Sequence, residues 1–225
     1  MSYECPVPAQ LKAVDYLHGV AEAHPLRRIL VGGHSKGGNL AMYAAVHCKS
    51  EHRHRIRAVY NHDGPGFCDN TLSTPMYTEM RERIHVFLPE SSIVAVLLEH
   101  DDHHRIVKST ARGLGQHDPY SWQVEGSDFV YAAERTAFGR ETEAIVDRLV
   151  NELTPAQKRR FTEGLFSLLE STGETTLSGI AAGKLQSLKS ILRSLADPDP
   201  AVQALLWETA LALGRALKES RQKKQ

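Results

Sequence analysis

One stretch constrains the fold of this chain more than any other. A short apolar run, residues 28–33, leads through Gly-His-Ser-Lys-Gly-Gly (33–38) into an alanine-rich segment that ends near Cys48. The run has the composition of a buried strand, and residues 37–48 show helical apolar spacing. Because Cβ atoms at positions 33 and 37 would collide with the neighbouring strand or helix, glycines there allow a tight strand-to-helix turn centred on Ser35.

The rest of the first half alternates between the same two patterns. Helical stripes occupy residues 10–24, 37–48, 76–83 and 91–99, and short apolar runs that predict strands occupy residues 28–33, 57–61, 84–88 and 105–108. Alternating strands and helices indicate an α/β fold with a mainly parallel sheet and crossover helices. Residues 113–120, rich in Gly, His, Asp and Pro, are expected to form a loop.

The pattern becomes helical throughout after about Gly139. Thr154-Pro155-Ala156-Gln157 is a helix start signal, with Thr as the N-cap, Pro at the first helical position and Gln three residues after the cap. Amphipathic stretches follow at residues 180–195 and 202–217. We therefore expect two parts: residues 1–138, and a helical C-terminal appendage at 139–225.

Ser35 is the candidate nucleophile. A strand-to-helix turn of this kind pushes the serine hydroxyl out at the carboxyl edge of the sheet. The helix that follows directs its positive end at the same place, and the main-chain N–H of Lys36 is the expected oxyanion donor. The alternative is a glycine-rich turn that cradles a phosphate. Neither G-x-G-x-x-G nor a P-loop G-K-[ST] spacing is present, which favours the nucleophile.

Several motifs resemble a known family. They are Gly33-His34-Ser35-Lys36-Gly37-Gly38-Asn39-Leu40-Ala41, Tyr60-Asn61-His62-Asp63-Gly64-Pro65-Gly66-Phe67, Pro89-Glu90-Ser91-Ser92-Ile93-Val94, Val107-Lys108-Ser109 and Gln116-His117-Asp118-Pro119-Tyr120-Ser121-Trp122-Gln123-Val124. Residues 10–135 thereby resemble the bacterial Mbeg-like family, a domain of unknown function among the lipase-like α/β hydrolases. The resemblance implies an α/β-hydrolase fold and a lipase-like triad, and it implies no particular substrate.

The chain differs from this family at its front. Family members carry an upstream strand and a loop resembling Phe-Arg-Gly-Thr, which would supply a second oxyanion donor, and no such segment precedes Ser35 here. We therefore expect residues 1–138 to be the C-terminal portion of an α/β-hydrolase domain, giving a partial α/β-hydrolase fold. Loss of one oxyanion donor typically lowers the rate by about 10²–10³.

His117 is the predicted base. A serine hydroxyl needs a base within hydrogen-bond reach, and histidine suits neutral pH. In α/β hydrolases the acid and then the histidine follow the serine along the chain, and His117 lies in the loop after the last predicted strand. The alternative is an ordinary surface histidine. His34 should point away from the reacting centre, and the histidines at positions 100, 103 and 104 precede the fourth strand.

The acid is Glu90 or one of three alternatives. Glu90 follows the third strand, where a triad carboxylate is expected. A lipase-style alignment instead places Ser92 at the acid position. Asp63 follows the second strand, and Asp118 adjoins His117. A Ser–His pair oriented by Ser92 or by a main-chain carbonyl is also possible.

These residues together predict a cofactor-free serine hydrolase acting on a small-molecule acyl ester or a lipid. Ser35 would attack the carbonyl, His117 would take the proton, and water would hydrolyse the acyl-enzyme. Two alternatives stay open, because the fold hosts many chemistries. One is a non-catalytic interaction module that keeps the turn as architecture, and the other is a thioesterase or peptidase using the same triad.

Composition bears on the class of partner and on the cellular compartment. Twenty-seven basic residues balance 27 acidic ones, which does not favour nucleic acid as a partner. Three cysteines without metal or redox spacing fit a reducing compartment, no signal peptide is evident, and no apolar run reaches the roughly 20 residues of a membrane span. We expect a cytoplasmic protein. The run at residues 100–104 (His-Asp-Asp-His-His) is expected to be a polar loop and not a metal site.

Overall fold

The computed structural model places its described residues in two units. Those residues are 6–67, 70–92, 94, 103–137, 139–140, 154, 156–157, 200 and 202–204. The sheet unit comprises Glu4–Leu88 and Leu97–Arg105. The loop unit comprises Met1–Tyr3, Pro89–Val96 and Ile106–Gln225.

A four-stranded parallel sheet confirms the α/β class predicted from the sequence. Its order is β1-β2-β3-β4, formed by β1 (Ile29–His34), β2 (Ile56–His62), β3 (Ile84–Pro89) and β4 (His104–Val107). β1 pairs with β2 so that His34 lies opposite His62, and β2 pairs with β3 so that His62 lies opposite Phe87. All four predicted strands are present, and their ends agree with the prediction to within one residue.

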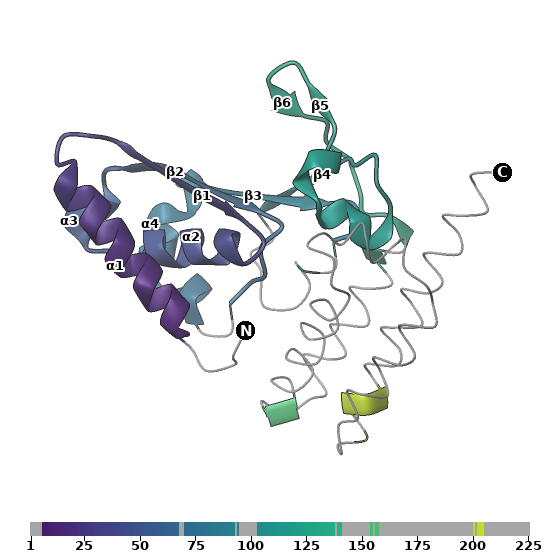
Figure 1. Cartoon of the computed structure of the whole chain (residues 1–225), viewed down its shortest axis with the longest axis horizontal. Helices are drawn as coiled ribbons and strands as arrows, with labels where there is room; N and C mark the ends of the chain where they lie inside the picture. Colours follow the sequence, from purple (N-terminus) through teal and green to yellow (C-terminus); the bar gives the residue numbers. More distant parts are fainter. Residues whose placement is uncertain are drawn as a thin grey trace. The chain divides into compact units, whose positions relative to one another are not determined.

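The described residues of the sheet unit form helices α1 (Pro8–Ala23), α2 (Lys36–His47), α3 (Ser50–Arg53) and α4 (Pro75–Met80), with 3₁₀ turns η1 (Asn70–Ser73) and η2 (Arg81–Arg83). The predicted helix at 76–83 is therefore α4 followed by η2. Figure 1 shows α1, α2 and α4 on the same face of the sheet. Right-handed crossovers that always step in one direction across a sheet place their helices on one face.

The core of the sheet unit lies between α1, α2 and the strands. Ala44, Ala45 and Val46 of α2 are buried, as are Leu17 and Ala21 of α1 and Val59 of β2. The helical spacing of residues 10–24 places Leu11, Leu17 and Ala21 on one apolar stripe. Leu17 and Ala21 are buried as that stripe predicts, but the prediction is wrong at Leu11, which is 50 % exposed. Gln10 is buried instead of Leu11, because its side-chain amide forms hydrogen bonds with the Val7 N–H and with Asn39.

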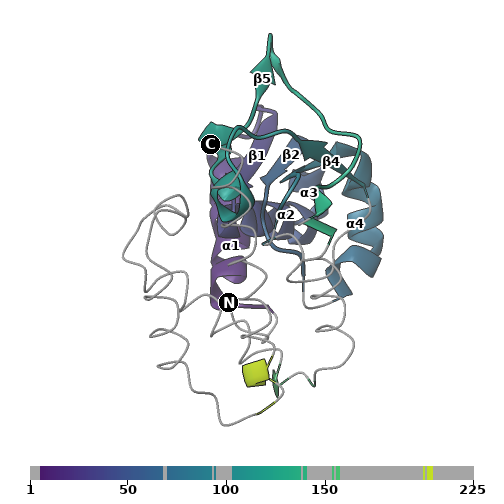
Figure 2. The same ribbon diagram turned by 90° about the vertical axis from the view of Figure 1, so that its right-hand side faces the viewer.

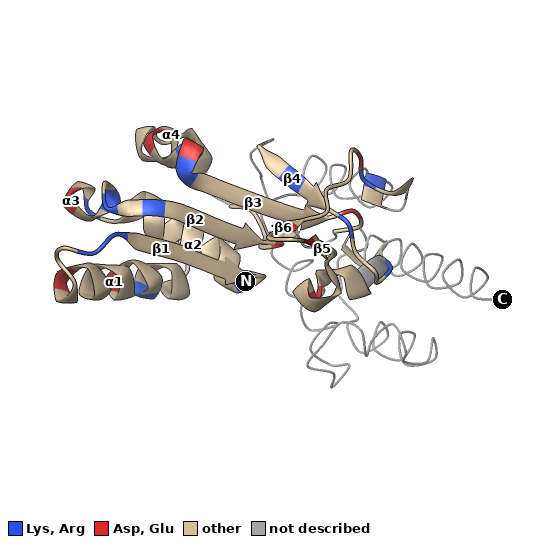
Figure 3. Ribbon diagram, turned by 90° about the horizontal axis from the view of Figure 1, so that it is seen from above, with Lys and Arg blue, Asp and Glu red and all other residues tan. Residues whose placement is uncertain are grey.

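β1 forms one edge of the sheet. Its sequence contains no Lys, Arg, Asp or Glu, as its tan ribbon in Figure 3 shows, and Leu30 is 66 % exposed. Edge strands without charges or proline are ready to pair with a further strand.

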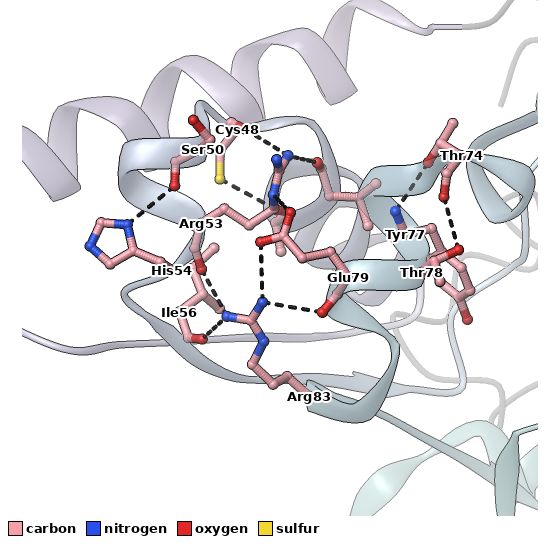
Figure 4. Close-up of polar contacts among 12 residues, drawn as sticks. Cys48, Ser50, Arg53, His54, Ile56, Thr74, Tyr77, Thr78, Glu79 and Arg83 are labelled. Atoms are coloured by element: carbon pink, nitrogen blue, oxygen red, sulfur yellow. Dashed lines mark hydrogen bonds and ion pairs between the residues drawn. The ribbon is translucent and has the colours of Figure 1, made fainter.

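A buried guanidinium ties the amino end of β2 to the helices around it. Arg53 donates from Nε to Glu79 Oε2 at 2.8 Å and from Nη1 to the carbonyls of Val46 at 3.0 Å and Cys48 at 3.2 Å (Figure 4). Arg83 Nη1 in turn donates to the carbonyls of Arg53 at 3.0 Å and Ile56 at 2.9 Å. Burial raises the pKa of the neighbouring Cys48 thiol to about 11, so this cysteine is a neutral packing residue.

Among the described residues of the loop unit, residues 113–129 form two 3₁₀ turns and a hairpin. The turns are η4 (Gly113–His117) and η5 (Pro119–Ser121), within the segment predicted to be a loop. The hairpin, absent from the prediction, pairs β5 (Val124–Glu125) with β6 (Asp128–Phe129) through Gly126 at φ 61°. It stands out from the two turns in Figures 1 and 2. Trp122, at its base, is buried.

The helix start predicted at Thr154 is confirmed by its capping hydrogen bonds. The Thr154 N–H donates to Gln157 Oε1 at 2.9 Å, and the Gln157 N–H donates to Thr154 Oγ1 at 3.4 Å. This reciprocal pair is a capping box. The predicted helix at 91–99 is wrong at its described residues, since Ser91 lies in a turn, Val94 lies in a bend and Ser92 between them is not helical. The rest of that segment, all of 180–195 and most of 202–217 lie outside the described residues. The division of the chain at 138/139 stays a prediction.

Candidate active site

Ser35 lies at a strained turn between β1 and α2. Its backbone angles are φ 55° and ψ −128°, a region that residues with a side chain rarely adopt. The Ser35 N–H donates to the carbonyl of His62 at 2.9 Å, and the Ser35 carbonyl accepts from the N–H of Gly38 at 2.9 Å. The turn therefore belongs to the sheet on one side and to the helix on the other, and the serine side chain is half-buried at the carboxyl end of β1.

Two glycines, Gly33 and Gly38, make this turn possible, whereas the sequence predicted Gly33 and Gly37. A Cβ at Gly33 would overlap the carbonyl group of Gly37 and lie 2.8 Å from the Gly38 nitrogen, so position 33 needs glycine as predicted. A Cβ at Gly37 would meet nothing within 4 Å, so the prediction that position 37 needs glycine is wrong. Gly38 has that role instead, because its Cβ would overlap the Asn61 side chain.

Asn39 anchors the start of α2 to two other segments. Its Nδ2 donates to the carbonyls of Pro65 at 3.2 Å and Gly66 at 2.7 Å, and its Oδ1 accepts from Gln10 Nε2 at 3.1 Å. Gln10 also accepts from the Val7 N–H at 2.9 Å, which fixes the start of α1. Asn39 and Gln10 are buried and their amide groups are paired, as buried polar groups require.

A second strained turn follows the neighbouring strand. Asp63 directly follows β2, has φ 51° and is 0 % exposed. Gly64 packs against the first turn, because a Cβ there would lie 2.6 Å from the Ser35 carbonyl oxygen and 2.8 Å from the Asn39 nitrogen. Asn61 Oδ1 accepts from the Gly64 N–H at 2.8 Å. Asp63 is therefore held next to the segment that carries Ser35.

The side chain of His62 is on the face of the sheet away from α2. Asn61, one residue before it, faces α2 and donates to Met42 Sδ at 3.0 Å, and successive strand residues alternate between faces. His62 stacks on Phe87 with ring centroids 5.4 Å apart. Burial lowers the pKa of His62, and a hydrogen bond to the Gly33 main chain opposes part of that shift. A neutral imidazole therefore lies beside β1, the strand that Ser35 directly follows.

In the loop unit, the segment after β3 is held by its main chain. The Glu90 N–H donates to the carbonyl of Val107 at 3.2 Å, and the Glu90 carbonyl accepts from the Thr136 N–H at 3.0 Å. A Cβ at Gly139 would overlap that same carbonyl oxygen. The Glu90 side chain is half-buried, whereas Ser91 and Ser92 are buried.

His117 is the last residue of η4 and is half-buried. The residue before it, Gln116, reaches the segment after β3, since its Oε1 accepts from the Ser91 N–H at 2.8 Å. The residue after it, Asp118, caps η5 by accepting from the Tyr120 N–H at 3.0 Å. The loop unit therefore brings the Glu90 segment and the His117 segment together.

The predicted site residues divide between the units. Ser35, Lys36 and Asp63 belong to the sheet unit, and Glu90, Ser92, His117 and Asp118 belong to the loop unit. Each group is described within its own unit, and the roles assigned to them stay predictions. Sequence reasoning missed Gln10, Asn39, Asn61 and Gln116 as structural residues of the site. Gln10 and Asn39 each have an apolar or glycine residue on both sides, which was the only local signal, whereas Asn61 and Gln116 are each followed by histidine and gave no such signal.

The described residues include no group of three His, Cys, Asp or Glu side chains arranged to hold a metal ion. Every helix in the described part of the chain is too short or too polar to cross a bilayer.

The fold defines an α/β protein with a parallel sheet and a strained strand-to-helix turn at its edge strand. A family model described as Mbeg1-like matches residues 1–167, which is most of the chain. The chain therefore belongs to the Mbeg1-like family. No curated protein and no solved structure matched it.

Proposed function

We propose that this chain carries the catalytic serine of an α/β-hydrolase-type serine hydrolase that acts on carboxylic esters. The observation that supports this most is the backbone of Ser35. A serine at φ 55° and ψ −128° between a parallel strand and a helix is costly in energy, by roughly 1–3 kcal/mol. Strain of this size at a non-glycine residue is typical of catalytic positions, and it is the geometry expected of a nucleophile elbow.

The start of α2 supplies the electrostatic part of the proposal. The first N–H groups of any helix have no partner inside that helix, and they carry its positive end. Lys36 is the first residue of α2, so its N–H lies beside the Ser35 carbon that bears the hydroxyl. We assign this N–H as the donor to the oxyanion that forms when an ester carbonyl is attacked.

The remaining roles follow from the order of residues along the chain. Ser35 Oγ bonds to the carbonyl carbon while His117 removes its proton, and Glu90 orients the histidine. The ester C–O bond then breaks, His117 returns the proton to the leaving alcohol, and water hydrolyses the acyl-enzyme by the same steps. The proposal rests on Ser35, because the backbone geometry of Ser35 supports a nucleophile whichever residue orients the histidine.

A fluorophosphonate probe tests this function, because it reacts with serines that an adjacent base activates. We expect one label per chain, located at Ser35 by peptide mapping and lost in Ser35→Ala. Ser50→Ala, which alters an exposed serine at the start of α3, serves as the matched control and should label normally. A folded chain that takes no label at Ser35 would support a non-catalytic module instead.

A further inference from the structure

Gln116 is a buried residue whose side-chain amide and main-chain carbonyl form hydrogen bonds with Ser91, Ala111 and Trp122. It is 4 % exposed. Its Oε1 accepts from the Ser91 N–H at 2.8 Å, its Nε2 donates to the Ala111 carbonyl at 3.2 Å, and its own carbonyl accepts from Trp122 Nε1 at 2.7 Å. Burying a primary amide is costly unless it is paired, so this arrangement fixes the residue in one position.

The contact with Ser91 joins two segments that are 25 positions apart in the sequence. Ser91 follows Glu90, whose main chain is itself bonded to Val107 and Thr136. Gln116 precedes His117, and on the other side Asp118 donates its N–H to the Gly115 carbonyl at 3.3 Å. The backbone of His117 therefore lies between two anchored residues, one of which is attached to the Glu90 segment.

We propose that Gln116 is a positioning residue that acts through His117. The inference rests on the function proposed above, and it specifies what holds the base in place. A base transfers a proton efficiently only when its nitrogen is within hydrogen-bond reach of the hydroxyl. A displacement of about 1 Å can lower the rate by roughly 10²-fold, so the bonds that fix Gln116 set how well His117 activates Ser35.

The test measures fluorophosphonate labelling of the full chain. Two quantities are recorded: the final extent of labelling, which counts competent molecules, and the rate constant at saturating probe, which reports activation of the serine. Gln116→Met keeps the shape of the side chain and removes both of its hydrogen bonds. We expect its rate constant to fall roughly 10- to 100-fold with the extent unchanged.

Two further variants distinguish positioning from folding. Gln116→Glu keeps the acceptor for the Ser91 N–H and should recover part of the rate. Gln123→Met is the matched control, because the described hydrogen bonds of this half-buried glutamine are made by its main chain, with Lys108 and Val130. Its rate constant should equal that of the unaltered chain.

A double-mutant cycle with His117→Ala gives the deciding result. If Gln116 acts through His117, then Gln116→Met has no further effect on the rate once His117 is absent. Two results for Gln116→Met would overturn the positioning role. One is a reduced extent of labelling with an unchanged rate constant, and the other is an equal loss of rate constant in the His117→Ala background. Labelling that depends on Ser35 and His117 but not on Gln116 overturns this inference alone. Failure of the unaltered chain to label at Ser35, or labelling indifferent to His117, overturns the proposed function and this inference with it.

Discussion

Ser35 and Asp63 occupy equivalent positions on neighbouring strands. Each directly follows the last residue of its strand, and each donates its N–H to the next strand: Ser35 to the His62 carbonyl at 2.9 Å, and Asp63 to the Phe87 carbonyl at 2.8 Å. They are also the two non-glycine residues with positive φ in the described part of the chain, at 55° and 51°. The carboxyl edge of the sheet therefore repeats one strained turn.

Glycine at either position should relieve this strain. We expect Ser35→Gly to unfold with a free energy about 1 kcal/mol higher than Ser35→Ala, because relief of roughly 1–3 kcal/mol of strain exceeds the roughly 0.5–1 kcal/mol entropy cost of glycine. Asp63→Gly should exceed Asp63→Ala by a similar amount. Urea unfolding of the four variants measures both differences.

Comparing glycine with alanine is the internal control, since both variants of a pair lack the original side chain. Glycine variants less stable than their alanine partners would show that neither backbone is strained. An effect at Ser35 alone would show that the two turns are not energetically equivalent.

The two glycines that flank Ser35 should respond differently to alanine. Gly33→Ala forces a methyl group into the Gly37 carbonyl, and main chain cannot yield as a flexible side chain can. We expect a loss of at least about 1–3 kcal/mol in unfolding free energy and loss of fluorophosphonate labelling. Gly37→Ala enters open space and should leave stability unchanged or raise it by up to about 1 kcal/mol.

Thermal unfolding and labelling of the two alanine variants give the comparison directly. Equal damage at positions 33 and 37 would contradict the structure and would favour the symmetric requirement predicted from the motif alone.

The strands and helices could be predicted from the sequence because local patterns determine them. Runs such as Ile29–Gly33 and the alanine spacing of α2 encode burial directly, so their ends were placed closely. Leu11 shows where periodicity fails. It fits the helical stripe, yet Gln10 is the buried residue because its amide pairs with Asn39.

The site was less predictable, because its important contacts join distant segments. The amide of Gln116 meets Ser91 at a separation of 25 positions, and nothing local identifies such a partner. The strain at Asp63 was also missed, since aspartate before glycine reads as ordinary turn chemistry. Gly37 and Gly38 could not be distinguished, because which of them faces Asn61 depends on how α2 packs on β2.

Stability should fall as the pH drops below neutral. Burial lowers the pKa of His62 and of His85 below their ordinary value of 6.5, and the charges of Arg105 and His103 add to the shift at His85. Arg105 Nη2 lies 3.1 Å from His85 Nδ1, a contact that suits a neutral imidazole. Below pH 6.5 the unfolded chain therefore binds protons that the folded chain does not, and stability declines until the folded pKa values are reached.

Urea unfolding at a series of pH values between 7.5 and about 5 measures this slope, which linkage predicts to be positive with rising pH. The double variant His62→Gln, His85→Gln should flatten part of it. His24→Gln, at an exposed histidine, is the control. A slope that the double variant leaves untouched would show that other groups cause the acid sensitivity.

The Arg53 network should support folding without contributing to chemistry. Arg53 precedes the amino end of β2, whereas Ser35 follows the carboxyl end of β1, so the two lie toward opposite ends of the sheet. Its guanidinium is the donor to the Val46 and Cys48 carbonyls and to Glu79 (Figure 4). Removing a donor from buried acceptors is expensive, while an exposed partner such as Glu79 can turn to water.

Arg53→Met should therefore lower the unfolding free energy by roughly 2–3 kcal/mol, measured by urea unfolding. Arg57→Met, at an exposed residue of β2, should change it little. Arg53→Lys should recover less than half of the loss, because an ammonium group cannot replace a planar fork that donates in three directions. The labelling rate constant of Ser35 in the folded fraction should stay the same in all three variants. A fall in that rate constant for Arg53→Met alone would show that this end of the sheet influences the serine turn.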